Sequence, residues 1–265
     1  MQNEYLYYVD EWIIALILVI LLTIFFEFGY FLGFKRLVGR KDEDIGAIQG
    51  GILGFLGIMF AFTFSMAASR FDSRRIAILN ESNAIGTTYL RVSLLPDSMK
   101  PEIYALLEKY VEYRLIYGRT TDLNKMKALT DSSEIVQLKI WRMASKNAVL
   151  NNNWNSSLFL STLNEMIDLS AERYEVQLNH VPEIIIYLMI LLATISTFTL
   201  GFGCGLEKNR KFIFSYSLVV LMILVLMVII DLDTPLGGII RVGDKSLSDL
   251  DQAIQKYSPL KSEGN

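Results

Sequence analysis

The stretch GAIQGGILGFLGIMFAFTFSMAASRFDSRRIAILNESNAIGTTYLR, residues 46–91, decides the fold of this chain. Its first half is long and apolar enough to span a bilayer, which takes roughly 20 apolar residues in a helix. Its second half is charged and amphipathic, and no proline interrupts either half. The stretch therefore predicts one helix that runs from lipid into water and joins a membrane-embedded part of the chain to an extramembrane part.

Outside this stretch, the apolar residues are again clustered rather than spread. Hydrophobic residues make up 52% of the 265 residues, and the mean hydropathy is +0.36. Four runs are long enough for transmembrane helices: 12–34, 46–68, 182–206 and 212–232. We therefore divide the chain into a first transmembrane pair (1–68), an extramembrane helical block (69–181), a second transmembrane pair (182–232) and a polar C-terminal tail (233–265).

The block between the two pairs has helical rather than strand periodicity. After the continuation of the second span, helices are predicted at about 100–118, 133–149 and 158–178, separated by LLPDSMKPE, the loop-like GRTTDLNKMKALTDSS and the turn NNNWNSS. The simplest arrangement is an antiparallel bundle whose first and last helices continue the second and third spans. The fold class predicted is an all-α membrane protein with four transmembrane helices and this inserted bundle.

Composition excludes several functional classes. Cys204 and His180 are the only cysteine and the only histidine, so the sequence predicts no disulfide, no metal site and no other cofactor. The net charge of −3 gives no reason to expect nucleic acid. We found no phosphate-binding loop, nucleotide fingerprint or convergent acid pair, so an enzyme is the least favoured class.

Orientation is predicted from lysine and arginine near the span ends. The short loops 35–45 and 207–211 carry four and three basic residues, which places both on the cytoplasmic side of the membrane. The bundle and both termini would then face outward. Arg70, Arg74 and Arg75, close to the end of the second span, favour the opposite orientation.

Small residues form a ridge along the second span. They recur with steps of three and four, and so share one helix face: Gly46, Gly50, Gly54, Gly57, Ala61, Ser65 and Ala68. Small residues let helices approach closely in lipid, where van der Waals packing drives association. The ridge predicts close packing, either against another span of the same chain or around the axis of a homo-oligomer, where it would line a pore.

Five further residues are candidates for an ion pathway. Phe60 and Phe64 flank the ridge one turn apart, and aromatic rings can close a pore by excluding water; the alternative is lipid-facing or core packing. Glu27 is an acid within the first span, which indicates either a structural polar contact or an ion pathway. Asp231 and Asp233 end the fourth span, either as interfacial anchors paired to arginine or as an acidic ring at a pore mouth.

Several motifs resemble those of the bacterial bestrophin-like domain family. They are AFTFSMAASRFDSRR (61–75), ESNAIGTTYLR (81–91) followed by LLPDS, EFGYFLG (27–33) and DLDTPLGGIIRV (231–242), and the similarity covers nearly the whole chain. The resemblance marks as motif residues Arg70, Phe71, Asp72, Asn83, Gly86, Arg91, Pro235, Gly238 and Arg241. Relatives often carry arginines after the DLD motif, where this chain has Thr234, Leu236 and Gly237.

The resemblance implies a four-span inner-membrane protein with a helical insertion, and the family's name refers to distant pentameric anion channels. The first hypothesis is therefore a homo-oligomeric, channel-like pore for small ions, anions among them, with the lipid bilayer as its environment. The alternative is a non-conducting membrane sensor or scaffold that signals to a partner through its helical bundle.

Overall fold

A computed structural model describes residues 11–35, 43–151, 154–234 and 238–259 of this protein, and within these ranges the regular structure is entirely helical. The α-helices are α1 (Glu11–Lys35), α2 (Glu43–Arg91), α3 (Lys100–Arg119), α4 (Leu123–Asn151), α5 (Trp154–Leu178), α6 (Glu183–Leu206), α7 (Phe212–Asp233) and α8 (Lys245–Tyr257). A short 3₁₀ helix, η2 (Val92–Leu94), follows α2. The predicted all-α class is confirmed.

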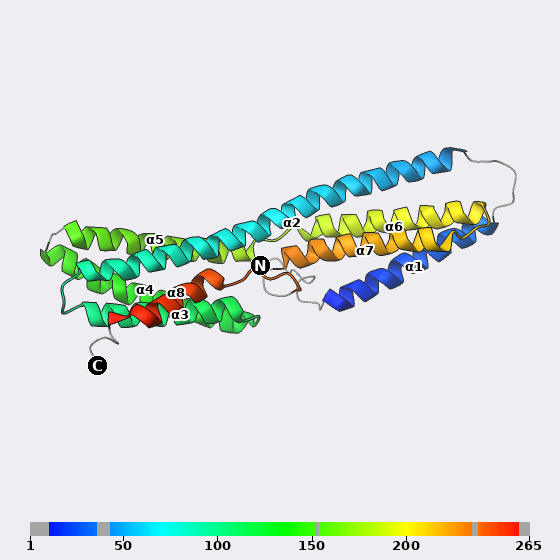
Figure 1. Ribbon diagram of the computed structural model, residues 1–265. Coiled ribbons are helices and arrows are strands. Elements are labelled where there is room, and N and C mark those ends of the chain that lie inside the picture. The colour runs from blue at the N-terminus through cyan, green and yellow to red at the C-terminus, as the bar shows by residue number, and fades with distance from the viewer. Residues whose placement is uncertain (1–10, 36–42, 152–153, 235–237, 260–265) are drawn as a thin grey trace. The chain divides into compact units, whose positions relative to one another are not determined.

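Within the described ranges, four helical segments are long and apolar enough to cross a membrane, and they contain the four predicted spans. Residues 46–91, for which one continuous helix is predicted, lie within the single 49-residue helix α2 (Figure 1). An α-helix satisfies its backbone groups internally, which is why such a segment can leave lipid without a break.

The chain divides into two compact units. The first, here called the membrane unit, comprises Met1–Phe71 and His180–Ile240, and the second, here called the bundle unit, comprises Asp72–Asn179 and Arg241–Asn265. The membrane unit has its own buried apolar cluster, to which α1, α2, α6 and α7 contribute. Its outward-facing side chains are also apolar, as expected for lipid contact: Ile17 and Leu221 are 56% and 57% exposed.

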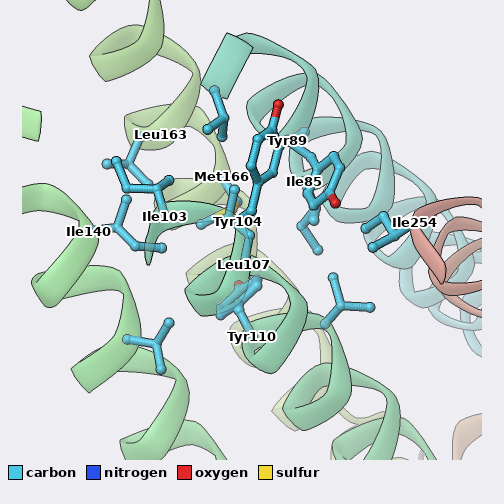
Figure 2. Close-up of a cluster of buried hydrophobic side chains, with 14 of the residues drawn as sticks. Ile85, Tyr89, Ile103, Tyr104, Leu107, Tyr110, Ile140, Leu163, Met166 and Ile254 are labelled. Atoms are coloured by element: carbon cyan, nitrogen blue, oxygen red, sulfur yellow. The ribbon is translucent and has the colours of Figure 1, made fainter. Parts of the chain in front are cut away.

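The core of the bundle unit is built from five helices (Figure 2). Side chains of α2, α3, α4, α5 and α8 meet in it, among them Ile85, Leu107, Ile140, Leu163 and Ile254. Burying each such aliphatic side chain contributes about 1.5–3 kcal/mol to stability, which offsets the entropy of ordering the helices. The contribution of α8 was not foreseen, since residues 233–265 were assigned to a polar tail.

One predicted loop is in fact helical. We assigned residues 118–133 to a loop, but α4 begins at Leu123. Asp122 explains this start, because its Oδ1 accepts hydrogen bonds from the backbone N–H groups of Asn124 (2.9 Å) and Lys125 (3.3 Å). An aspartate that caps free N–H groups in this way initiates a helix despite the polar residues that follow.

The predicted continuity of the bundle with the third span is also interrupted. Helix α5 ends at Leu178 and α6 begins at Glu183, so residues 179–182 are not helical. Pro182 accounts for the break, because proline has no N–H and disfavours helical backbone in the residue before it. Continuity holds only for α2.

Candidate functional site

The small-residue ridge of α2 is not covered by any described part of the chain. A Cβ atom placed on Gly46, Gly50, Gly54 or Gly57 would meet nothing within 4 Å. Ala61 and Ser65, which continue the ridge, are exposed, and Ala68 is half-buried. The predicted role of the ridge in helix packing stays a prediction.

Two phenylalanines flank this ridge in different environments. Phe60 is half-buried and packs against the apolar cluster of the membrane unit. Phe64 is 44% exposed. Its neighbour Thr63 faces the interior, where it is buried and donates a hydrogen bond to the Met59 carbonyl. Phe64 is therefore the one of the pair whose ring is accessible, and its role in a constriction stays a prediction.

The periodicity of the ridge continues beyond the span. In the bundle unit, Ile76, Leu79 and Leu90 lie at the same steps of three and four, and they are 55%, 47% and 73% exposed. Asn83 falls in the same series and is exposed as well. An 11-residue repeat of this kind keeps one face of a straight helix in line. In each unit, the α2 residues that recur at these steps of three and four are therefore mostly exposed.

Close glycine packing does occur in the membrane unit, but between α1 and α6. A Cβ on Gly29 or Gly33 would overlap the carbonyl oxygen of Phe198 or Phe202, and one on Gly201 or Gly205 would overlap that of Phe26 or Tyr30. In each helix the two glycines are four residues apart. This GxxxG spacing was the signal that could have found the contact.

Glu27 of α1 makes polar contacts within the membrane unit. Tyr216 of α7 donates a hydrogen bond to its Oε1 at 3.1 Å, and Arg210 Nη1 lies 3.4 Å from the same atom. The Arg210 guanidinium also lies over the Tyr30 ring, 4.5 Å from its centroid. Glu27 therefore makes polar contacts of the kind expected for a structural role. Its side chain remains 38% exposed. Its role in an ion pathway stays a prediction.

Asp231 and Asp233 are buried and bind backbone amides. The two carboxylate oxygens of Asp231 accept hydrogen bonds from Ile239 N (2.7 Å) and Ile240 N (2.9 Å), while Asp233 Oδ2 accepts one from Val181 N (2.8 Å). Their exposed fractions are 5% and 0%. These bonds fix the segments next to α6 and α7, and the role of the two acids at a pore mouth stays a prediction.

A buried charge cluster in the bundle unit was not predicted. Glu81 of α2 is 0% exposed and accepts hydrogen bonds from Arg114 Nε (2.5 Å), Arg114 Nη2 (3.2 Å), Arg173 Nη1 (2.7 Å) and the Tyr110 hydroxyl (3.1 Å). Burial alone would raise the pKa of Glu81, but the two guanidiniums outweigh it and hold that pKa below its ordinary value. The carboxylate is therefore charged, and it joins α2, α3 and α5.

The residues that the family resemblance singles out lie in both units. Arg91 Nη1 donates a hydrogen bond to the Leu158 carbonyl at 2.9 Å, and a Cβ on Gly86 would lie 3.3 Å from Leu250 of α8. Gly238 has a φ of 84°, a conformation that favours glycine. The other members vary in environment: Arg70 and Phe71 are half-buried, Asp72 and Asn83 are exposed, Arg241 is exposed, and Pro235 lies outside the described residues.

Among the described residues, no group of three or more His, Cys, Asp or Glu side chains is placed so that it could bind a metal ion. Cys204 is buried, and its Sγ lies 3.5 Å from the Ser215 hydroxyl.

Comparison with known proteins gives a family and a fold. The model of the Bestrophin-like domain family matches residues 20–247. A crystal structure of a bacterial bestrophin homologue from Klebsiella pneumoniae, carrying a single substitution, is similar with a TM-score of 0.67 and 14% identity over 92% of this chain and 97% of that one. A crystal structure of a second variant of that homologue is similar with a TM-score of 0.68 and 14% sequence identity, and the alignment covers 93% of this chain and 98% of that one.

A crystal structure described as a membrane protein is similar with a TM-score of 0.66 and 13% identity, covering 93% of this chain and 98% of that one. No curated protein sequence matches the chain. At these identities the solved structures establish the fold alone, whereas the family model matches most of the sequence. The chain therefore belongs to the Bestrophin-like domain family.

Proposed function

We propose that this protein is a homo-oligomeric channel for small ions, anions among them, in the bacterial inner membrane, with α2 facing the oligomer axis. The observation that carries the proposal is the uncovered ridge of α2. A Cβ on any of Gly46, Gly50, Gly54 or Gly57 would meet none of the described residues within 4 Å, so each glycine leaves room for a close neighbour. Copies of α2 arranged around an axis would use that room, since small residues allow close approach in lipid.

The similarity to bestrophin homologues supports the same reading. The solved relatives align over more than nine-tenths of this chain, so both units belong to the shared fold. Phe64 is exposed next to the ridge and would place an aromatic ring in the pore of each assembled copy. A ring of such side chains narrows a pore and makes it hard to wet, which is a known way of gating ions.

Ion flux from proteoliposomes tests this proposal, with chloride, potassium and protons measured separately. Phe64→Ala removes a ring from the constriction and is expected to raise the flux several-fold, since dewetting depends steeply on the size of an apolar side chain. Phe62→Ala is the matched control, because Phe62 is 70% exposed on the other side of the same helix. It is expected to leave the flux unchanged.

Equal effects of the two substitutions would remove Phe64 from the mechanism. Absence of flux from protein that is folded and oligomeric would favour the non-conducting sensor or scaffold. A chain that remains monomeric in mild detergent and in lipid would contradict the proposed assembly around α2.

For the orientation, we propose the one that the basic loops predict, with the bundle unit outside. Lys125→Cys places a thiol on an exposed position of α4, in a Cys204→Ser background. Labelling of intact cells by an impermeant thiol reagent supports this orientation, whereas labelling only after the cells are opened reverses it.

A further inference from the structure

The bundle unit contains a pocket next to the buried charge cluster. Its volume is about 470 Å³, and its walls come from α3, α4 and α5. Arg114, Gln137 and Ser170 form its inner end, where Arg114 and Gln137 are 2% and 5% exposed. Pockets of 300–1,000 Å³ with a few fixed polar groups are typical of small-molecule sites.

The buried charge cluster, which meets the inner end of the pocket through Arg114, carries a net positive charge. Arg114 and Arg173 are both buried, and among the described residues Glu81 is the only carboxylate that hydrogen-bonds to either of them. Two guanidiniums and one carboxylate leave a net charge of +1. A buried charge that is not compensated is costly, so this arrangement favours a bound anion of a single negative charge.

Arg114 also has a donor left for such an anion. Its Nε and Nη2 bind Glu81, while Nη1 bonds to no acceptor in the described part of the chain. The neutral groups around it are already engaged: Gln137 Nε2 donates to Tyr110 and Ser170, and the Ser170 hydroxyl donates to the Ile167 carbonyl. One charged donor group suits a carboxylate better than a phosphate dianion, which needs several.

The mouth of the pocket has the opposite charge. Asp131, Glu134 and Glu175 lie on it and are exposed, against a single Lys127. Free anions are repelled by such a rim, whereas a ligand with an ammonium group is attracted to it. Leu138, which is exposed, and Ile167, which is half-buried, add apolar surface to the wall of the pocket.

We propose that this pocket binds a small zwitterionic amino acid with an apolar side chain. The carboxylate lies on Arg114 Nη1 at the inner end, the ammonium group lies among Asp131, Glu134 and Glu175, and the side chain contacts Leu138 and Ile167. The site is distinct from the α2 ridge, and its occupancy can be measured whether or not the protein conducts.

Equilibrium dialysis of the full-length protein in detergent tests this site with L-leucine as the probe. Two analogues of L-leucine each lack one of its charged groups: 4-methylpentanoate has no amine, and 3-methylbutylamine has no carboxylate. Loss of the carboxylate is expected to weaken binding about 10–100-fold, because a buried charge-assisted hydrogen bond is removed. Loss of the amine removes only exposed ion pairs and is expected to weaken binding about 5-fold.

Variants of the pocket separate its two ends. Ala171→Trp places a large side chain on the pocket wall and is expected to abolish binding of L-leucine. The double variant Glu134→Gln, Glu175→Gln is expected to weaken binding of L-leucine about 5-fold and to leave that of 4-methylpentanoate unchanged or stronger. Glu172→Gln, an exposed acid of α5 that does not line the pocket, is the matched control and is expected to have no effect.

Three results would overturn the proposal. One is no binding of L-leucine up to about 10 mM by protein that elutes as a single folded species. Another is unchanged binding by Ala171→Trp, which would place the ligand elsewhere. The third is tighter binding of phosphoethanolamine than of L-leucine, which would assign the pocket to a phosphate-bearing lipid headgroup.

Discussion

Two sets of glycines in the membrane unit have the same spacing and opposite surroundings. Gly29 and Gly33 of α1 interlock with Gly201 and Gly205 of α6 so closely that a Cβ on any of them would overlap a carbonyl oxygen. A Cβ on Gly46, Gly50, Gly54 or Gly57 of α2 would meet none of the described residues within 4 Å. Four-residue glycine spacing therefore identifies a helix face suited to close approach, but it does not identify the partner.

The two sets of glycines are therefore needed for different reasons, one for folding of the single chain and the other for the proposed assembly. The α1–α6 glycines are needed for the single chain to fold, since the two backbones contact each other. Gly46, Gly50, Gly54 and Gly57 of α2 make no such contact with the described residues, so a larger side chain there is expected to affect the proposed assembly rather than the fold of the single chain. Substitutions that are identical in chemistry should therefore have different consequences in the two places.

The largest expected effect comes from a bulky residue in the interlocked pair. Gly201→Leu forces α1 and α6 apart and should cost more than about 3 kcal/mol, enough to eliminate most folded protein. Gly57→Leu is the matched change in α2 and should leave the folded monomer intact while weakening the oligomer. Size-exclusion yield and thermal unfolding measure the first effect, and native mass spectrometry the second. Equal losses of folded protein from the two variants would contradict the proposed difference between the two sets of glycines.

Two glutamates extend the comparison from packing to charge. Glu81 is fully buried between two guanidiniums, and Glu81→Gln should cost about 3–5 kcal/mol because it leaves them without a counter-charge. Glu27 is half exposed in its contact with Arg210, and Glu27→Gln should cost about 1 kcal/mol or less. Denaturant or thermal unfolding in one detergent gives both values. A cost at Glu27 as large as that at Glu81 would contradict this difference and would mean that its contacts with Tyr216 and Arg210 contribute more to stability than their exposure suggests.

The smallest expected effect is the dependence on acid. The pKa of Glu81 is held below its ordinary value of 4.5 in the folded state, so the unfolded chain binds the proton more readily. The stability contributed by Glu81 is then complete above pH 4.5 and is lost as the pH falls towards the folded-state pKa. Thermal unfolding between pH 3 and about 7 should show the gap between wild type and Glu81→Gln narrowing in acid. A gap that stays constant would mean that folding does not shift the pKa of Glu81.

Much of the fold could be predicted because its signals are local. The length of α2 follows from a span and an amphipathic segment with no proline between them. The start of α4 was missed although Asp122 is a typical helix cap, because the polar residues after it resembled a loop. Helix α8 was missed for a similar reason: Leu247 and Ile254 are buried at helical spacing, but charged residues separate them.

The candidate sites were less predictable, because they depend on which helices meet. Glu81, Arg114 and Arg173 lie on three different helices, and each has the appearance of an ordinary surface charge in its own segment. Asp231 and Asp233 were recognised as notable, yet their hydrogen bonds to backbone amides could not be read from the sequence. Side-chain patterns identify helix faces, whereas the assignment of partners requires the tertiary structure.

The interlocked glycines also set an order of events during synthesis. Gly29 lies in the first span and Gly201 in the third, with the whole of α2 to α5 between them in the sequence. At a translation rate of 5–20 residues per second, α1 waits roughly 10–30 s in the membrane before its partner emerges. During that time α2 to α5 can begin to associate in the bundle unit, whereas its core is complete only once α8, which follows α6 and α7 in the sequence, has been made.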